Sequence, residues 1–223
     1  ERFVLISTDK AVKPSCVYGA SKKIAENIVL NCRNEAGEYM VVRFGNVLGS
    51  RGSIVPLFKE QILSGGPVTI THPETSRFFM TIPEAATLVL QAGGVGTGEN
   101  LYILDMGEPL KILEMARQMI RFYGFSEDDI QLSFIGMRTG EKIHETLWSN
   151  KENPIQTEFP KIMTLGNKSR FTQSELEELL TELSWICFPG DGKNELFRNR
   201  IELRRSLNRF MPSVEVPANE PKY

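Results

Sequence analysis

Residues 1–44, ERFVLISTDKAVKPSCVYGASKKIAENIVLNCRNEAGEYMVVRF, decide the fold. They contain a continuous apolar run over residues 3–7, which is typical of a parallel strand buried on both faces. Apolar residues at helical spacing then predict a helix over residues 19–34, and a second apolar run predicts a strand over residues 39–44. This order of strand, helix and strand is a βαβ unit, so the sequence predicts a parallel sheet and an α/β fold.

The same alternation continues as far as residue 165. Ser53 is a candidate helix cap that follows a loop expected over residues 45–52. The apolar runs predict strands over residues 67–71, 101–104, 131–135 and 161–165, and the helical patterns predict helices over residues 53–63, from Pro83 and around residues 112–120.

Beyond Gly166 only helical patterns remain. Thr172 and Glu175 have the spacing of a capping box, which predicts the start of one helix. A second, Arg-rich amphipathic helix is expected through residue 210, and the proline-containing residues 212–223 are expected to form a tail.

The composition is that of an ordinary globular protein and excludes several function classes. The chain has 223 residues, 41% of them apolar, and a net charge of -2, which argues against a protein that binds nucleic acid through its phosphates. No apolar run approaches the ~20 residues of a membrane-spanning helix. Three separated cysteines, Cys16, Cys32 and Cys187, form no disulfide or zinc pattern, so a reducing compartment is expected.

Two short stretches could carry chemistry. Thr8, Asp9 and Lys10 follow the first predicted strand, and ligands of open α/β sheets bind at the carboxyl ends of strands. Tyr18 and Lys22 are four residues apart at a helix start, where a nearby ammonium favours the phenolate form of tyrosine and makes it a possible general base. The alternatives are a polar strand end with turn hydrogen bonds and an exposed helical pair.

Together with later motifs, these residues resemble the extended short-chain dehydrogenase/reductase superfamily. Within it the chain is similar to the bacterial polysaccharide-biosynthesis branch of nucleotide-sugar dehydratases, typified by UDP-N-acetylglucosamine 4,6-dehydratase. The resemblance covers residues 1 to about 165 and is carried by TDK at 8–10, YGASK at 18–22, RFGNVLGSRGS at 43–53, THP at 71–73, RFFMT at 77–81, LDMG at 104–107 and RTGEKIHE at 138–145.

The resemblance implies a Rossmann-like doubly wound parallel sheet whose N-terminal half is missing. Residues 1–165 would form the second half of an NAD(P)-binding fold with an interleaved nucleotide-sugar-binding part, followed by a helical extension over residues 166–211 and the tail over residues 212–223. The chain starts on a strand without an initiator Met, so we expect a piece of a longer protein that is inactive by itself.

The cofactor, NAD or NADP, would have its glycine-rich site outside this chain. Residues 93–98, GGVGTG, follow a predicted helix and are interpreted as a loop, not as a phosphate-binding turn. The resemblance implies a cytoplasmic location, no membrane contact by this piece, and possible homo-oligomers. Because long-chain relatives carry N-terminal membrane helices, an inner-membrane anchor of the parent protein is left open.

The resemblance also assigns catalytic roles. Tyr18 would take the proton of the sugar 4-hydroxyl, Lys22 would hydrogen-bond the nicotinamide ribose, and Thr8 would hydrogen-bond the 4-oxygen. Lys10 would remove the C5 proton, and Asp9 would protonate the leaving 6-hydroxyl. The product would be a 4-keto-6-deoxy nucleotide sugar for surface polysaccharide or capsule synthesis. The sequence keeps Tyr18, where many long-chain relatives have Met.

Substrate contacts follow in the same way. Asn46, Arg77 and Arg138 match residues that bind the diphosphate, and Glu141 could bind a nucleotide ribose. The alternative for either arginine is a surface ion pair with Glu74 or Glu141. Further candidates are Val55, Pro56 and Phe58, which could line the nucleotide pocket or pack in the core, and His144, which is interpreted as a structural residue at a helix start.

Two other functions stay open. A nucleotide-sugar 4-epimerase would share Tyr18, Lys22 and the diphosphate site but needs no acid and base for C5 and C6, so the Asp9–Lys10 pair favours the dehydratase. A binding or regulatory module without catalysis would not need the complete set of candidate catalytic residues.

Overall fold

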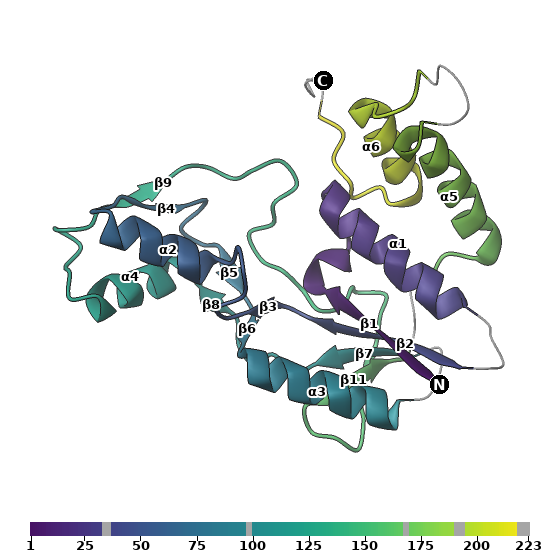
Figure 1. The fold of residues 1–223 in the computed structure, drawn as a ribbon, viewed down its shortest axis with the longest axis horizontal. Helices are drawn as coiled ribbons and strands as arrows, with labels where there is room; N and C mark the ends of the chain where they lie inside the picture. The colour runs from purple at the N-terminus through teal and green to yellow at the C-terminus, as the bar shows by residue number, and fades with distance from the viewer. Residues whose placement is uncertain (33–36, 97–99, 167–169, 190–194, 218–223) are drawn as a thin grey trace.

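The computed structural model describes residues 1–32, 37–96, 100–166, 170–189 and 195–217 (Figure 1). Its central sheet has the strand order β1-β2-β7-β11-β10. The strands are β1 (Arg2–Thr8), β2 (Glu38–Phe44), β7 (Leu101–Leu104), β11 (Ile162–Leu165) and β10 (Pro154–Gln156). The first three are parallel, as predicted, whereas β11 runs antiparallel to β7 and β10 antiparallel to β11.

Helices cover both faces of this sheet (Figure 1). Helix α1 (Val17–Asn31) lies on one face, and α3 (Ile82–Val95) lies on the other. The main core between them is built from buried residues of β2 and β7 and the facing side of α3, including Val42, Ile103 and Leu88. The strand-helix-strand unit is therefore confirmed; the end of its predicted helix, residue 34, lies outside the described residues.

A smaller lobe extends from the carboxyl side of the sheet (Figure 1). It contains α2 (Ile54–Leu63), α4 (Ile112–Phe122), and the parallel pair of β4 (Val68–Ile70) and β9 (Leu132–Phe134). Phe58 is completely buried in its core, so the core alternative for this residue is correct. Short pairs connect the lobes: β3 (Asn46–Val47) with β6 (Phe79–Met80), and β5 (Ser76–Arg77) with β8 (Leu110–Lys111).

The C-terminal part packs on α1. Helix α5 (Gln173–Cys187) begins with the predicted capping box, and α6 (Arg200–Phe210) is shorter than expected. Both helices bury apolar residues against Ala20 and Ile24 of α1. Residues 212–216, here named the C-terminal strap, belong to the predicted tail but pack against the body of the protein, where Val214 is buried.

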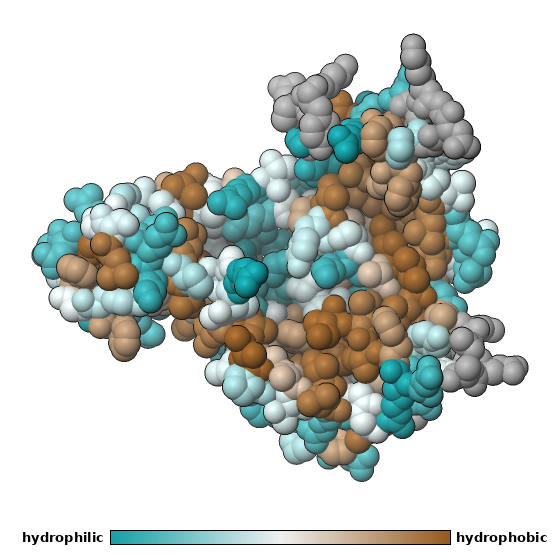
Figure 2. All heavy atoms as spheres, viewed as in Figure 1, coloured by the Kyte–Doolittle hydropathy of each residue, from teal (hydrophilic) through white to brown (hydrophobic). Residues whose placement is uncertain are grey.

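Strand β1 is the outer strand of the described sheet, so it is not buried on both faces as its apolar sequence predicts. Phe3 and Ile6 are 49% and 55% exposed. Figure 2 shows apolar side chains gathered around β1 and α3. Strand β1 therefore presents an open hydrogen-bonding edge next to apolar surface.

Three smaller expectations change. The predicted loop over residues 45–52 contains β3, and Ser53 stands at the N-cap of α2 without making a capping hydrogen bond. Gly93 and Gly94 belong to the last turns of α3, so they are helical and not a loop; residues 97–99 lie outside the described residues.

None of the helices in the described ranges is both long and apolar enough to cross a bilayer.

Candidate active site

The polar turn after β1 is held together by side-chain hydrogen bonds. It forms a 3-10 helix, η1 (Asp9–Ala11), which Thr8 caps by accepting a bond from the Lys10 amide. Thr8 Oγ1 donates to Asp9 Oδ1 at 2.9 Å, and Lys10 Nζ lies 2.9 Å from the same oxygen and 3.2 Å from Asn46 Oδ1. The structure thus brings four predicted site residues together.

Asp9 is the most unusual member of this group. Its side chain is completely buried, yet Lys10 beside it is partly exposed. The second carboxylate oxygen, Oδ2, is also buried and has no hydrogen-bond partner within the part of the chain that the structure describes. Because a buried polar atom without a partner costs stability, this oxygen calls for a partner such as a water or a ligand.

Tyr18 and Lys22 share one face of α1, as predicted. Lys22 Nζ lies 5.9 Å from the centre of the Tyr18 ring, and Tyr18 is 54% exposed. Gly19, between them, packs so closely on the backbone carbonyl of Lys10 that any larger residue would displace α1. The missing side chain therefore lets the Tyr-Lys turn lie directly against η1.

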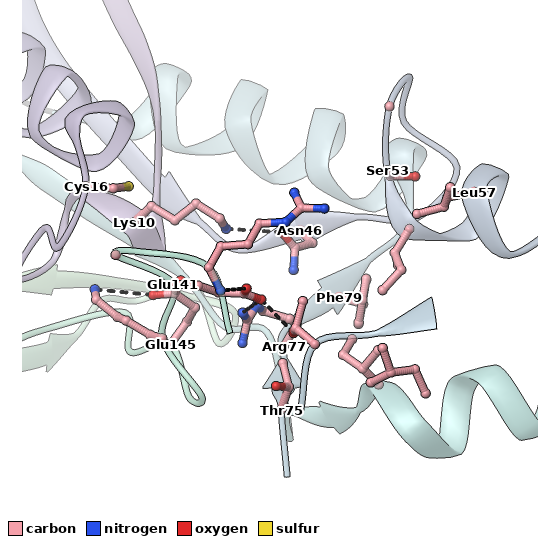
Figure 3. A pocket seen from close by; sticks show the side chains of 18 of the residues that line it. Lys10, Cys16, Asn46, Ser53, Leu57, Thr75, Arg77, Phe79, Glu141 and Glu145 are labelled. Atoms are coloured by element: carbon pink, nitrogen blue, oxygen red, sulfur yellow. Dashed lines mark hydrogen bonds and ion pairs between the residues drawn. The ribbon is translucent and has the colours of Figure 1, made fainter. Parts of the chain in front are cut away.

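Next to η1 is a cavity of about 610 Å³ between the sheet and the smaller lobe (Figure 3). Its size is within the usual range of small-molecule sites. It is lined by five predicted site residues: Lys10, Asn46, Arg77, Arg138 and Glu141. The other four, Thr8, Asp9, Tyr18 and Lys22, are not among its lining residues, so the predicted site is divided into a cavity and the turns next to it.

Glu141 is the centre of the cavity's hydrogen bonds. It accepts from Arg77 Nη2 at 3.3 Å, from Thr71 Oγ1 at 2.9 Å and from the Arg138 backbone amide at 3.2 Å. The ion-pair alternative for Arg77 is therefore realised with Glu141, while Glu74 pairs with Lys111. Within the described residues, the Arg138 guanidinium makes no hydrogen bond or ion pair.

The sequence interpretation missed the apolar wall of the cavity. Ile54 and Leu57 of α2 line it, whereas Val55 and Pro56 do not. Ile54 and Leu57 are three residues apart and share a helix face, but Phe58, four residues after Ile54, lies next to that face in the core of the smaller lobe, against which Ile54 also packs. The i, i+3 spacing of Ile54 and Leu57 is visible in the sequence, but helical period alone does not separate these cavity residues from Phe58.

His144 plays the structural role expected of it, but not at a helix start. Its Nδ1 atom lies 2.8 Å from Ser76 Oγ, and the residue forms an isolated bridge with Ser76 in a loop. This contact joins the loop after Glu141 to β5, which carries Arg77. His144 therefore helps to fix the shape of the cavity without lining it.

A buried ionic network joins the elements that carry the site residues. Arg43 on β2 binds Glu26 of α1 through two hydrogen bonds, 3.0 Å and 2.7 Å, and lies 3.4 Å from Glu152. Ser7, at the end of β1, donates to Glu26 at 2.7 Å. Because these residues tie the ends of β1 and β2 to α1, they fix the elements that carry Asp9 and Tyr18.

The network shifts the pKa of its members. Burial alone would raise the pKa of Glu26, but attraction and hydrogen bonds from Arg43, with help from Lys23 and Ser7, hold it below its usual value. Burial lowers the pKa of Lys23 despite the neighbouring Glu26. Glu26 and Arg43 therefore form a fully ionised pair at neutral pH.

The fold and the cavity define a Rossmann-like α/β protein with a second, smaller lobe. The chain belongs to the polysaccharide biosynthesis protein family, whose sequence profile matches residues 1–167. This confirms the family that the motifs indicate. The site assignments to individual residues stay predictions.

Two curated relatives illustrate the range of the similarity. Capsular polysaccharide biosynthesis protein CapD of Staphylococcus aureus is 50% identical over 184 residues, covering 82% of this chain and 31% of CapD. UDP-glucose 4-epimerase of Rickettsia rickettsii is 36% identical over 155 residues, covering 68% of this chain and 44% of the epimerase. The chain thus spans less than half the length of either relative.

Solved structures agree with the fold. Pen from Bacillus thuringiensis superimposes with a TM-score of 0.66 at 27% identity, covering 81% of this chain and 62% of Pen. DesIV, a dTDP-glucose 4,6-dehydratase from Streptomyces venezuelae with NAD and TYD bound, superimposes with a TM-score of 0.59 at 18% identity, covering 82% of this chain and 61% of DesIV. The partial Rossmann-like fold is therefore confirmed.

Proposed function

We propose that this chain is the substrate-binding part of an NAD(P)-dependent UDP-sugar 4,6-dehydratase that serves polysaccharide synthesis. The observation that carries the proposal is the Asp9–Lys10 pair, in which a buried carboxyl and a partly exposed amine meet at a strand end beside a charged cavity. An acid and a base side by side are what the removal of water from adjacent carbons needs. The CapD relative supports the biosynthetic context.

The cavity is proposed to hold the nucleotide diphosphate. Arg138 offers a guanidinium that has no partner among the described residues and whose planar fork suits phosphate oxygens, and Arg77 and Asn46 supply further donors. Ile54 and Leu57 offer an apolar wall for the base. Glu141 is proposed to orient the arginines, and its role at a nucleotide ribose stays a second possibility.

NAD or NADP is the proposed cofactor, and when bound it would accept a hydride from the sugar and return it. Tyr18 and Lys22 fit a contact with its nicotinamide ribose because both lie on the outer face of α1. No described strand of this chain leads into a glycine-rich phosphate turn, so its pyrophosphate site is proposed on a further segment. The open edge of β1, with Phe3 and Ile6 exposed, suits pairing with such a segment. The cytoplasm, which supplies both nucleotides, is the proposed location.

The chain's own residues are proposed to move three protons. Tyr18 takes the proton of the sugar 4-hydroxyl, and Thr8 holds the 4-oxygen. The resulting ketone acidifies the C5–H bond, and Lys10 removes that proton. Asp9 gives a proton to the departing 6-hydroxyl, which leaves as water. The relay needs Asp9 and Lys10 in opposite protonation states, and their 2.9 Å contact provides a path to exchange a proton.

A 4-epimerase is the second candidate because of the Rickettsia rickettsii relative. An epimerase inverts C4 without touching C5 or C6, so the Asp9–Lys10 pair would have no reaction to perform. A non-catalytic module is disfavoured for the same reason. Such a module would not need Thr8 and Lys10 to be hydrogen-bonded to the buried carboxyl of Asp9.

The test is the reaction of the whole protein in deuterated water. We expect deuterium at C5 and loss of water from the sugar. Tyr18→Phe should abolish C4 oxidation, because no group accepts the 4-hydroxyl proton. Lys10→Met should still form 4-keto sugar in one turnover but lose C5 exchange by about 10²–10⁴-fold.

Lys59→Met, on the exposed face of α2, is the matched control and should behave as wild type. Normal C5 exchange in Lys10→Met would remove the role proposed for Lys10. A wild-type product of unchanged mass with inverted C4 would replace the dehydratase by the epimerase.

A further inference from the structure

The C-terminal strap returns from α6 to the linker that precedes α1. In Figure 1 the yellow segment after α6 runs beside the purple start of α1. Ser213 Oγ donates to the Pro14 carbonyl at 2.8 Å, and the Glu215 amide donates to the Ser15 carbonyl at 3.1 Å. Asn208 of α6 donates to the Val214 carbonyl at 2.9 Å. The strap is therefore hydrogen-bonded both to α6 and to the linker before α1.

The strap also reaches the loop that carries Arg138 and Glu141. The carboxylate of Glu215 accepts a hydrogen bond from the Gly140 amide at 2.9 Å. Ser15 Oγ donates to the carbonyl of the same glycine at 2.6 Å. Both backbone groups of Gly140 are thus held from outside the loop, one by the strap and the other by the linker.

Gly140 is a point of close contact between the loop and the linker. Its φ of +75° is in the left-handed region, and a Cβ there would lie 2.6 Å from the Ser15 carbonyl oxygen. A residue with a side chain at position 140 would therefore push the loop away from the linker. A carboxylate on the Gly140 amide adds a charged acceptor, which makes a stronger hydrogen bond than a neutral one.

The residues next to Gly140 in the chain are the ones proposed to bind substrate. Glu141 follows it directly and bonds Arg77 and Thr71, and Arg138 precedes it by two residues. A loss of the Glu215 contact would release the backbone between Arg138 and Glu141 without removing any group that touches the cavity. Glu215 itself does not line the cavity.

We infer that Glu215 is a positioning residue for nucleotide binding, acting through the Gly140 amide on the loop of residues 138–142. The inference rests on the proposed function, since it assigns the loop to the diphosphate. The matching family profile ends at residue 167, so Glu215 belongs to a part of the chain that the profile does not cover. The C-terminal strap thereby contacts the site loop as well as the linker before α1.

The test measures UDP affinity by calorimetry in the whole protein, together with amide hydrogen exchange of Gly140. Glu215→Ala should raise the Kd for UDP roughly fivefold, the effect of one hydrogen bond, and speed Gly140 exchange. Glu215→Gln keeps an acceptor oxygen and should stay within about twofold of wild type. Glu202→Ala is the matched control: Glu202 is a partly exposed acidic residue of α6 that pairs with Arg205, and its loss should change neither.

Four other results would overturn the inference. If wild type binds UDP and Glu215→Ala binds it equally, the positioning role is wrong and the proposed function stands. If Glu202→Ala is weakened as much as Glu215→Ala, the effect is general to the C-terminal part and the inference fails. If Glu215→Gln is weakened as much as Glu215→Ala, an acceptor oxygen on the Gly140 amide does not hold the loop, and the inference fails as well. If wild type binds no UDP, the proposed function fails and the inference fails with it.

Discussion

Two clusters of charged residues in this molecule are built in opposite ways. Around Arg43, the side chains of Arg43, Glu26 and Glu152 are 0–2% exposed, and the guanidinium is held by both carboxylates and by the Leu147 carbonyl. In the cavity, Glu141 holds Arg77, while the guanidinium of Arg138 binds none of the described residues. Among the described residues, all three nitrogens of the Arg43 guanidinium are hydrogen-bonded, whereas the Arg138 guanidinium has no partner.

The difference separates a structural network from a binding site. Buried charges that satisfy one another hold elements in place but cannot accept a ligand without losing their own contacts. Spare donors on the wall of a cavity cost little while water solvates them, and they become strong contacts when an anion displaces that water. The comparison can be tested by removing one charge from each cluster.

The largest expected effect is on stability, from Glu26→Gln. The substitution keeps the side-chain shape but leaves the buried Arg43 without its main counterion, which should cost about 3–5 kcal/mol of unfolding free energy. Urea denaturation measures it. Glu178→Gln, which removes an exposed partner of Arg209, should stay within about 0.5 kcal/mol. Equal losses in both variants would contradict the structural reading of the Arg43 network.

Lowering the pH removes the charge of Glu26 without a mutation, by protonating its carboxylate. The pKa of Glu26 is lower in the folded protein than in the unfolded chain, because Arg43, Lys23 and Ser7 stabilise its carboxylate against the cost of burial. Its contribution to stability is therefore present above about pH 4.3, the ordinary glutamate pKa, and is lost as the pH falls through the folded value.

The Glu26→Gln variant isolates this contribution from those of other carboxylates. The difference in unfolding free energy between wild type and variant should be constant near neutral pH and shrink on acidification below about pH 4.3. Denaturant titrations at a series of pH values measure both curves. A difference that stays constant down to pH 3 would show that the Glu26 carboxylate is not the stabilised group.

Much of the fold could be predicted from the sequence because its elements have clear periods. The run in β7, the capping box of α5 and Pro83 in the first turn of α3 all lie where the sequence places them. The antiparallel direction of β11 could not be predicted, because a short apolar run does not encode which way its neighbour runs. A short apolar run also does not show whether a strand lies inside a sheet or at its edge, so the exposure of Phe3 and Ile6 in β1 could not be predicted.

Local motifs predicted the site residues but not the contacts between residues that are far apart in the chain. Thr8, Asp9 and Lys10 meet because they are adjacent in the chain, and Tyr18 and Lys22 because they are one helical turn apart. The contact of Glu215 with Gly140 spans 75 positions and depends on the path of the strap, for which the prolines after residue 211 gave only a loop signal. Charge alone did not show that Glu141, and not Glu74, would pair with Arg77.

The smallest expected effect, and the most specific, comes from Arg138→Ala. Arg138 has no side-chain partner to lose among the described residues, so the unfolding free energy should change by no more than about 0.5 kcal/mol. Affinity for a UDP-sugar should fall by about 1.5–3 kcal/mol, because one charge-assisted contact with the diphosphate is lost. Calorimetric titration at two salt concentrations measures it, and the salt dependence should be weaker in the variant.

Arg77→Ala and Arg205→Ala complete this comparison. Arg77 is bonded to Glu141 and to the Ser76 and Ile143 carbonyls, so its removal should lower both stability and affinity. Arg205, on the surface of α6, should change neither. Affinity lost without stability marks a group whose partner is the ligand, and affinity lost with stability marks one whose partners are in the protein. If Arg138→Ala binds the UDP-sugar as wild type does, its guanidinium faces only solvent, and the cavity cluster lacks the spare donor that distinguishes it from the network around Arg43.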